Sequence, residues 1–256
     1  MISAIQNISQ ATIFGSHNAK IYKGGILAIL WQSFIGFLQL IPRMIRKDFD
    51  FVFVGFFGQL LTRMIALFVK KPIVLDMFVS AFDTLVEDRN ITDNNSLLSR
   101  YLFTLDKQSG KRATLIFVDT HAQAEYYHDT FGISVDKMKR VFVGCDEVLF
   151  HPLPEKPESC TVLYYCSYLP LHGVDVVVEA AELLQADTSI RFKIIGRGIE
   201  FGKIQKLIQE RQISNIELAA PVPVEQLPFE IQNSIICLGG HFGASSKACR
   251  VIPGKV

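Results

Sequence analysis

The segment from Cys160 to Gly198 constrains the fold more than any other part of the chain. Its first run, Thr161–Cys166, is apolar, β-branched and aromatic, which is typical of a strand buried on both faces. After a short turn, apolar residues recur at helical spacing over 174–184, with acidic residues on the opposite face. A second apolar run, Phe192–Ile195, leads into Gly196-Arg197-Gly198. The pattern predicts a β-α-β unit, and ligands of open α/β sheets bind at the carboxyl ends of such strands.

The same alternation of strands and helices continues on both sides of this unit. It predicts parallel α/β sheets in two domains, with residues 1–150 and 160–256 separated by a linker at 151–159 that holds three prolines. In the first domain we expect strands at Asp50–Gly55, Ile73–Leu75, Leu115–Val118 and Arg140–Val143, and helices at Gln59–Val69, Asn94–Arg112 and from a Thr120 capping box to Gly132. In the second we expect helices at Phe201–Gln212 and Val224–Gln232, and strands at Ile216–Leu218 and Ile235–Leu238.

Composition excludes several classes of protein. Of the 256 residues 49% are hydrophobic and 20% charged, which is enough apolar material for packed cores and argues against disorder. A net charge of +1 argues against an electrostatic nucleic-acid binder. The five cysteines follow no metal-ligand spacing, so we expect reduced thiols, a cytoplasmic location and no metal.

The segment Gly24–Pro42 carries no charged side chain and is flanked by basic residues: Lys20, Lys23, Arg43, Arg46 and Lys47. Three alternatives fit it, namely a buried or surface-docked helix, monotopic contact with a membrane, and a membrane span of about 20 residues. Basic flanks favour anionic lipid. We therefore expect peripheral contact with the inner face of a membrane through residues 24–47, while Met1–Gly15 lacks the pattern of a secretory signal.

Several ordered motifs resemble the family-4 glycosyltransferases, which have the GT-B fold. The C-terminal motifs are Pro170–Asp175, Ala180-Ala181 and Lys193–Gly198, and the N-terminal ones are Phe53–Gly58, Asp76–Thr84, Val118–Thr120, Val143–Asp146 and Phe150–Pro152. This resemblance covers the chain from about Asp50 to its end. It implies an α/β protein of two Rossmann-like, doubly wound domains that face a cleft, with the acceptor-side domain first and the donor domain second.

The resemblance also implies a reaction: transfer of a sugar from a nucleotide-sugar, with retention at the anomeric carbon and without a bound metal. The diphosphate is the leaving group, so the site must stabilise developing negative charge. The positions implied for binding the donor are His172, Gly173, Gly196, Arg197, Gly198, Phe242 and Gly243, and those implied for catalysis are Asp76, Lys247 and Arg250.

Each of these positions also has a purely structural interpretation. His172 stands where much of the family has lysine, and is either a phosphate contact or a turn histidine, mostly neutral at pH 7. The loop of Lys247 and Arg250, within a run similar to the family's F-G-x-S-x-K-A-x-R-V-I-P-x-K, is either an anion site or a solvated loop. Asp76 is either a catalytic carboxylate or a turn cap, with Asp83 as a rival.

The resemblance is incomplete at both ends of the chain. The first strand and glycine loop of the acceptor-side domain are not recognisable, and the sequence stops before the helix in which relatives carry a ribose-binding glutamate. We therefore expect a truncated transferase with a cell-envelope or lipid-linked acceptor. As a fragment, this polypeptide alone is expected to be inactive. A non-catalytic, membrane-docked relative is the alternative. An unrelated nucleotide-binding Rossmann enzyme is disfavoured, because Phe201 stands where G-x-G-x-x-G needs its third glycine.

Overall fold

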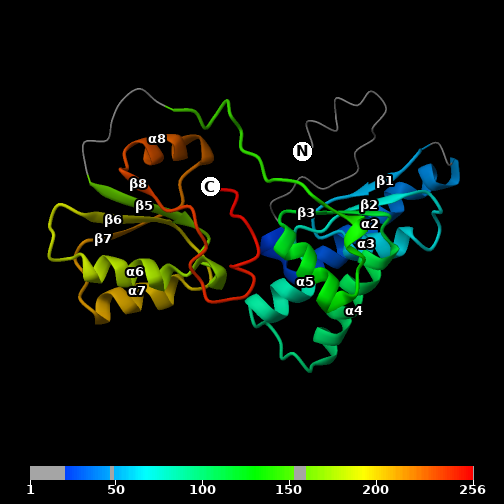
Figure 1. Ribbon diagram of the computed structural model, residues 1–256, viewed down its shortest axis with the longest axis horizontal. Coiled ribbons are helices and arrows are strands. Elements are labelled where there is room, and N and C mark those ends of the chain that lie inside the picture. Colours follow the sequence, from blue (N-terminus) through cyan, green and yellow to red (C-terminus); the bar gives the residue numbers. More distant parts are fainter. Residues whose placement is uncertain (1–20, 47–48, 153–159, 256) are drawn as a thin grey trace. The chain divides into compact units, whose positions relative to one another are not determined.

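The computed structural model describes residues 21–46, 49–152 and 160–255. These residues form two compact units (Figure 1). The first unit runs to Val86 and resumes at Asn90–Val141, whereas the second consists of Glu87–Arg89 and the chain from Phe142 onward. Most of the expected linker, and the turn expected at Gly15–Asn18, lie outside the described residues.

The first unit holds a parallel sheet of four strands in the order β1-β2-β3-β4. Its strands are β1 (Val52–Val54), β2 (Ile73–Asp76), β3 (Leu115–Val118) and β4 (Met138–Arg140). Its helices are α2 (Ile21–Arg46), α3 (Gln59–Ile65), α4 (Leu97–Arg112), α5 (His121–Phe131) and a 3-10 turn at Val135–Lys137. A π-helix at Asp83–Asp88 begins in this unit, and its last two residues belong to the second. The core between sheet and helices is apolar and aromatic, with Leu75, Ile116, Tyr127 and Phe131 fully buried. Along β2 and β3, alternate residues are buried and the others partly buried, so neither strand has an exposed residue.

Polar caps set the helix ends of the first unit. The Thr120 hydroxyl accepts from the Gln123 N–H at 3.0 Å, as a capping residue should, and α5 ends at Gly132 with φ of 63°. The Gln123 side chain does not complete the expected capping box, since its Oε1 accepts from the Asp119 N–H instead. In α4 the cap is Ser96, which accepts from the Ser99 N–H at 3.0 Å, so the helix starts at Leu97 rather than at Asn94.

The second unit holds another parallel sheet, in the order β7-β6-β5-β8. Its strands are β5 (Thr161–Cys166), β6 (Arg191–Gly196), β7 (Ile216–Ala219) and β8 (Ile236–Cys237), with helices α6 (Val174–Leu183), α7 (Phe201–Glu210) and α8 (Leu227–Gln232) and 3-10 turns at Pro170–His172 and Val224–Gln226. Figure 1 shows α6 and α7 on one side of this sheet and α8 on the other. The apolar face of α6, with Val174, Val177 and Val178 buried, packs into the core beneath β5 and β6. The β-α-β unit predicted between Cys160 and Gly198 is therefore present.

Other predicted bounds also differ from the structure. The strand expected at Arg140–Val143 lies at Met138–Arg140, because Met138 is the buried residue that pairs with β3, whereas Phe142 and Val143 are exposed. The helix expected at Gln59–Val69 ends at Ile65, where the backbone tightens into a turn. The segment Gly24–Pro42 is part of the longer α2, which passes through Pro42. Among the described residues, no helix is both long enough and apolar enough to cross a membrane.

Candidate functional site

The carboxyl edge of the second sheet is built from two loops that are hydrogen-bonded to each other. The turn after β5 provides the acceptors and the loop after β8 the donors: the Phe242 N–H donates to the His172 carbonyl at 3.2 Å, and the Gly243 N–H to the Leu171 carbonyl at 3.1 Å. The Tyr164 hydroxyl lies 2.8 Å from the His172 carbonyl oxygen and 3.1 Å from that of Gly240. The two loops are thus held as one rigid edge, and the N–H groups of Phe242 and Gly243 are already engaged.

Glycine at three of the predicted donor-binding positions is required by packing. Gly173 has φ of 58°, and a Cβ there would lie 2.3 Å from the Gly243 nitrogen. A Cβ at Gly243 would in turn lie 2.3 Å from the Pro170 carbonyl oxygen. Gly196, with φ of 142°, lies so close to the Cys166 carbonyl that a side chain could not fit. These glycines let neighbouring loops touch, so their presence follows from the fold and is not by itself evidence of a ligand.

Two histidine rings face this edge. The centroids of His172 and His241 are 5.4 Å apart, and burial lowers the pKa of His172 to about 3 and that of His241 to about 4. His172 Nδ1 accepts from the Leu169 N–H at 3.2 Å, so the neutral ring carries its proton on Nε2. His241 Nδ1 is buried with no partner among the described residues. At neutral pH the pair is therefore uncharged and offers hydrogen bonds rather than charge.

The positive charge at this edge comes from lysines. Lys247 is buried, and Lys255 Nζ lies 4.1 Å from the Tyr164 ring centroid and donates to the Tyr165 carbonyl at 3.1 Å. Burial lowers the pKa of Lys255 to about 8, so it remains mostly protonated at pH 7. Both lysines act on the His241 ring, since each lowers its pKa. Lys255 was not among the predicted residues, although it ends the run that suggested Lys247 and Arg250.

Arg197 follows β6 and belongs to the same edge of the sheet. Its guanidinium carbon lies 3.7 Å from the ring centroid of Phe201, the first residue of α7. Phe201, which breaks the dinucleotide fingerprint, therefore positions Arg197 by a cation–π contact. At Gly198 a Cβ would collide with the Ser167 carbonyl, so the turns after β5 and β6 also touch here.

Arg250 has a structural partner. Its guanidinium lies 3.9 Å from a carboxylate oxygen of Glu87, and the nearby Ser245 hydroxyl lies 3.1 Å from Asp88 Oδ1. These contacts attach Glu87–Arg89 to the second unit. Arg250 thus helps to hold Glu87–Arg89 in the second unit.

In the first unit, the loop that follows β2 is held by side chains from three helices. Asp106 of α4 accepts from the Ser80 hydroxyl at 2.7 Å and from the N–H groups of Ala81 and Phe82 at 3.2 and 2.8 Å. Gln59 of α3 donates to the Val79 carbonyl at 2.6 Å, and Gln123 of α5 to the Phe78 carbonyl at 2.8 Å. Burial raises the pKa of Asp106 to about 6. Side chains of the first unit therefore hydrogen-bond much of the backbone of this loop and hold it in place.

Asp76, the predicted catalytic carboxylate, begins that loop. Its Oδ1 accepts from the Phe78 N–H at 3.1 Å, which is the geometry of a turn cap, and burial raises its pKa. Its rival, Asp83, begins the π-helix and is buried, with its N–H donating to the Ser80 hydroxyl at 3.0 Å.

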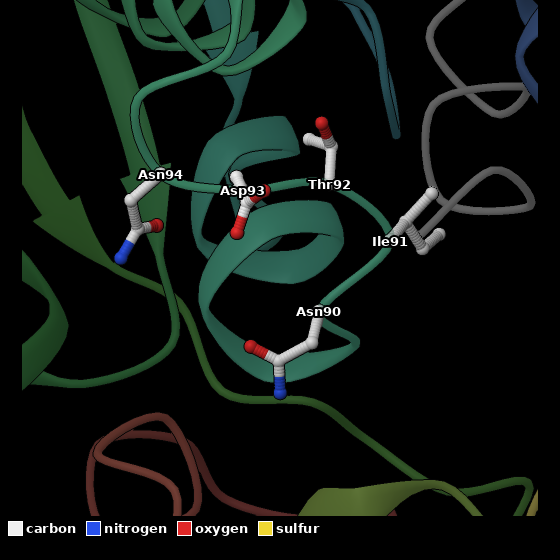
Figure 2. A pocket seen from close by; sticks show the side chains of 5 residues that line it. All are labelled: Asn90, Ile91, Thr92, Asp93 and Asn94. Atoms are coloured by element: carbon white, nitrogen blue, oxygen red, sulfur yellow. The ribbon is translucent and has the colours of Figure 1, made fainter.

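Figure 2 shows a hollow of the first unit lined by Asn90, Ile91, Thr92, Asp93 and Asn94. All five residues come from the single loop between the π-helix and α4, and they include one carboxylate and no cation. The hollow therefore lacks the charge that would bind a phosphate. Among the described residues, no group of histidine, cysteine and carboxylate side chains is placed to hold a metal ion.

The edge of the second sheet, by contrast, has the chemistry of an anion site. Lys247 and Lys255 supply charge, while His172 offers a neutral N–H donor. Lys255 lowers the pKa of both histidines and Lys247 that of His241, so positive charge faces both rings. Cations beside neutral N–H donors are a combination that binds anions.

Solved structures share this arrangement of two parallel sheets. Sucrose-phosphate synthase from Thermosynechococcus elongatus matches 90% of the chain at 12% identity, with a TM-score of 0.62. TarM of S. aureus, in a complex that includes UDP, matches 79% at 14% identity with a TM-score of 0.57, and Anabaena HepE, in complex with UDP and glucose, matches 82% at 11% identity with a TM-score of 0.60. The chain has the GT-B fold.

The match covers only part of the length of each relative. The chain spans 39% of the length of TarM, 57% of the sucrose-phosphate synthase and 56% of HepE. No protein-family model and no curated protein sequence matches the chain. The resemblance expected from the motifs is thus confirmed at the level of the fold.

Proposed function

We propose that this GT-B chain serves a retaining glycosyltransferase that moves a sugar from a uridine diphosphate sugar to a cell-envelope or lipid-linked acceptor. The observation that carries the proposal is the placement of buried Lys247 and partly buried Lys255 beside two neutral histidines at the edge of the second sheet. Two proteins that share the fold have been captured with UDP. We further propose a cytoplasmic location, peripheral on the inner face of the membrane.

In this proposal the diphosphate lies against Lys247, Lys255 and the Nε2–H of His172. As the bond between the anomeric carbon and the diphosphate oxygen breaks, negative charge grows on the leaving group, and fixed cations and N–H donors stabilise it. The acceptor hydroxyl forms the new bond to the same carbon and gives its proton to the departing diphosphate. Arg197, stacked on Phe201, is placed to border the nucleoside.

The other predicted residues have supporting roles in this proposal. Gly173, Gly196, Gly198, Phe242 and Gly243 shape the donor edge through their close loop contacts. Arg250 acts through its ion pair with Glu87. Asp76 orients the acceptor or the sugar from the first unit, where burial raises its pKa.

Binding of UDP tests the donor site. The double substitution Lys247→Ala/Lys255→Ala should weaken UDP binding by about 3 kcal/mol or more, because each charged hydrogen bond contributes about 1.5–3 kcal/mol. Uridine, which lacks phosphates, should bind both proteins equally. The matched control is Lys203→Ala/Lys206→Ala, which removes two largely exposed lysines of α7. Equal losses of UDP and uridine affinity in isothermal titration would contradict the proposal.

The alternative is a non-catalytic relative that binds a nucleotide without transferring sugar. Two observations favour it: His172 is neutral where much of the family has lysine, and Arg250 is held by Glu87. Tight UDP binding together with no hydrolysis or transfer of a UDP-sugar, across a panel of lipid-linked acceptors, would favour this alternative.

A further inference from the structure

The α2 helix presents an apolar stripe to solvent on the side opposite the core. Trp31, Phe34, Ile35, Leu38 and Ile45 recur at the spacing of one helix face, and each is between 36% and 74% exposed. The opposite face is the packed one, since Phe37 and Leu40 join the core cluster and Gly36 lies against Leu61 of α3. The side chains of the stripe are therefore not part of the core that the described residues form.

A second group of exposed apolar residues follows α3 and contacts α2 through Phe37. Leu67 and Phe68 are 67% and 66% exposed, and the Phe68 ring centroid lies 5.6 Å from that of Phe37. Helices α2 and α3 are packed neighbours (Figure 1). We call these seven side chains, Trp31, Phe34, Ile35, Leu38, Ile45, Leu67 and Phe68, the α2–α3 apolar face. Large apolar and aromatic residues that are exposed on or directly after two packed helices indicate an interaction surface.

The charge around this face is strongly positive. Residues 21–75 contain seven lysines and arginines against two aspartates, a net charge of +5, while the remainder of the chain carries −4. Lys70 and Lys71 directly follow Leu67 and Phe68 and are exposed, as is Arg46, next to Ile45. Aromatic and aliphatic side chains rimmed by cations are the combination that anionic lipid headgroups and the upper acyl region accept.

We infer that the α2–α3 apolar face docks the chain on an anionic lipid surface. Helix α2 lies parallel to the membrane plane, with its stripe in the headgroup–acyl boundary and Arg46, Lys70 and Lys71 against the phosphates. This inference deepens and rests on the proposed function, because a docked transferase meets a lipid-linked acceptor at the same surface.

The chain carries its own reporter for this docking. Trp31 is the single tryptophan of the sequence and belongs to the face. Mixing the full 256-residue chain with vesicles of phosphatidylcholine and phosphatidylglycerol should shift Trp31 emission to the blue and sediment the protein with the vesicles. Pure phosphatidylcholine should give much weaker binding, and added salt should reverse the binding to anionic vesicles because it screens the charges.

Two pairs of variants locate the surface. Phe34→Glu/Leu38→Glu should weaken vesicle affinity at least about tenfold, whereas Leu97→Glu/Leu183→Glu, which alters two leucines that are each 84% exposed, should bind as wild type does. Lys70→Glu/Lys71→Glu should also weaken binding about tenfold or more, against the control Lys203→Glu/Lys206→Glu. Urea unfolding and UDP affinity should be unchanged in each variant. A variant that loses vesicle binding but keeps both then shows a failure of docking and not of the donor site.

Three results would overturn the inference. The first is equal binding to neutral and anionic vesicles, and the second is binding that the control variants lose as much as the test variants do. The third is a blue shift that depends on protein concentration without vesicles, which would make the face a contact between copies of the chain.

Discussion

The two sheets have the same parallel topology but opposite polar chemistry at their carboxyl edges. In the first unit, Asp106 is buried and accepts three hydrogen bonds from one loop, and its neighbours Asp83 and Asp119 are also acidic and buried. In the second unit, buried Lys247, partly buried Lys255 and two neutral histidines gather instead. The first edge is acidic and its loop is fixed by Asp106, whereas the second edge is basic. In the proposed function, this difference in charge decides which edge binds the diphosphate.

The largest loss of stability should come from removing Asp106, the side chain that holds the loop at the first edge. Asp106→Ala orphans the Ser80 hydroxyl and two backbone N–H groups, so it should destabilise the first unit by on the order of 3–5 kcal/mol. Asp136→Ala, which alters an exposed aspartate, is the control. Urea unfolding followed by Trp31 emission would measure the change. A loss below about 1 kcal/mol would mean that the carboxylate is not the anchor.

The second edge should be most sensitive to steric change where its loops touch. Gly243→Ala puts a Cβ 2.3 Å from the Pro170 carbonyl oxygen, so it should cost about 1–3 kcal/mol and weaken UDP binding. Gly144→Ala is the matched control, because no atom lies within 4 Å of its Cβ position. Thermal unfolding and UDP titration of both variants test this. Equal behaviour of the two would show that the loops can separate.

Acid should affect the two edges in opposite directions. The pKa values of His172 and His241, about 3 and about 4, lie below the 6.5 of a free histidine, so the unfolded chain binds more protons and the second unit loses stability as pH falls from about 6.5 toward 4. The pKa of Asp106, about 6, lies above 3.8, so the folded first unit binds more protons and gains stability as pH falls from about 6 toward 4. Hydrogen exchange at pH 7 and pH 5 would resolve the two units. Parallel changes in both would contradict the comparison.

Much of this layout follows from sequence periodicity. The bounds of β5 agree with the prediction because its apolar run is short and ends at turn residues, and α6 begins after the predicted Gly173 turn. Asp106 could not be predicted as an anchor, because its partners lie 24 to 26 residues away and nothing local to α4 indicates them. Lys255 carried a weak signal, as the last residue of a family-like run, but its position over Tyr164 depends on tertiary packing. The structure explains the predicted glycines by packing, because they allow neighbouring loops to touch. Their role in binding a donor stays a prediction.

Hydrogen exchange with and without UDP tests the central claim most directly. If the edge of the second sheet is the donor site, UDP should protect the backbone of the turn at 167–175 and of the loop at 240–250, and uridine should protect them much less. The loop at 76–83, held by Asp106, should exchange at the same slow rate in both states. Protection of 76–83 alone, or no protection at either edge at saturating UDP, would contradict the account.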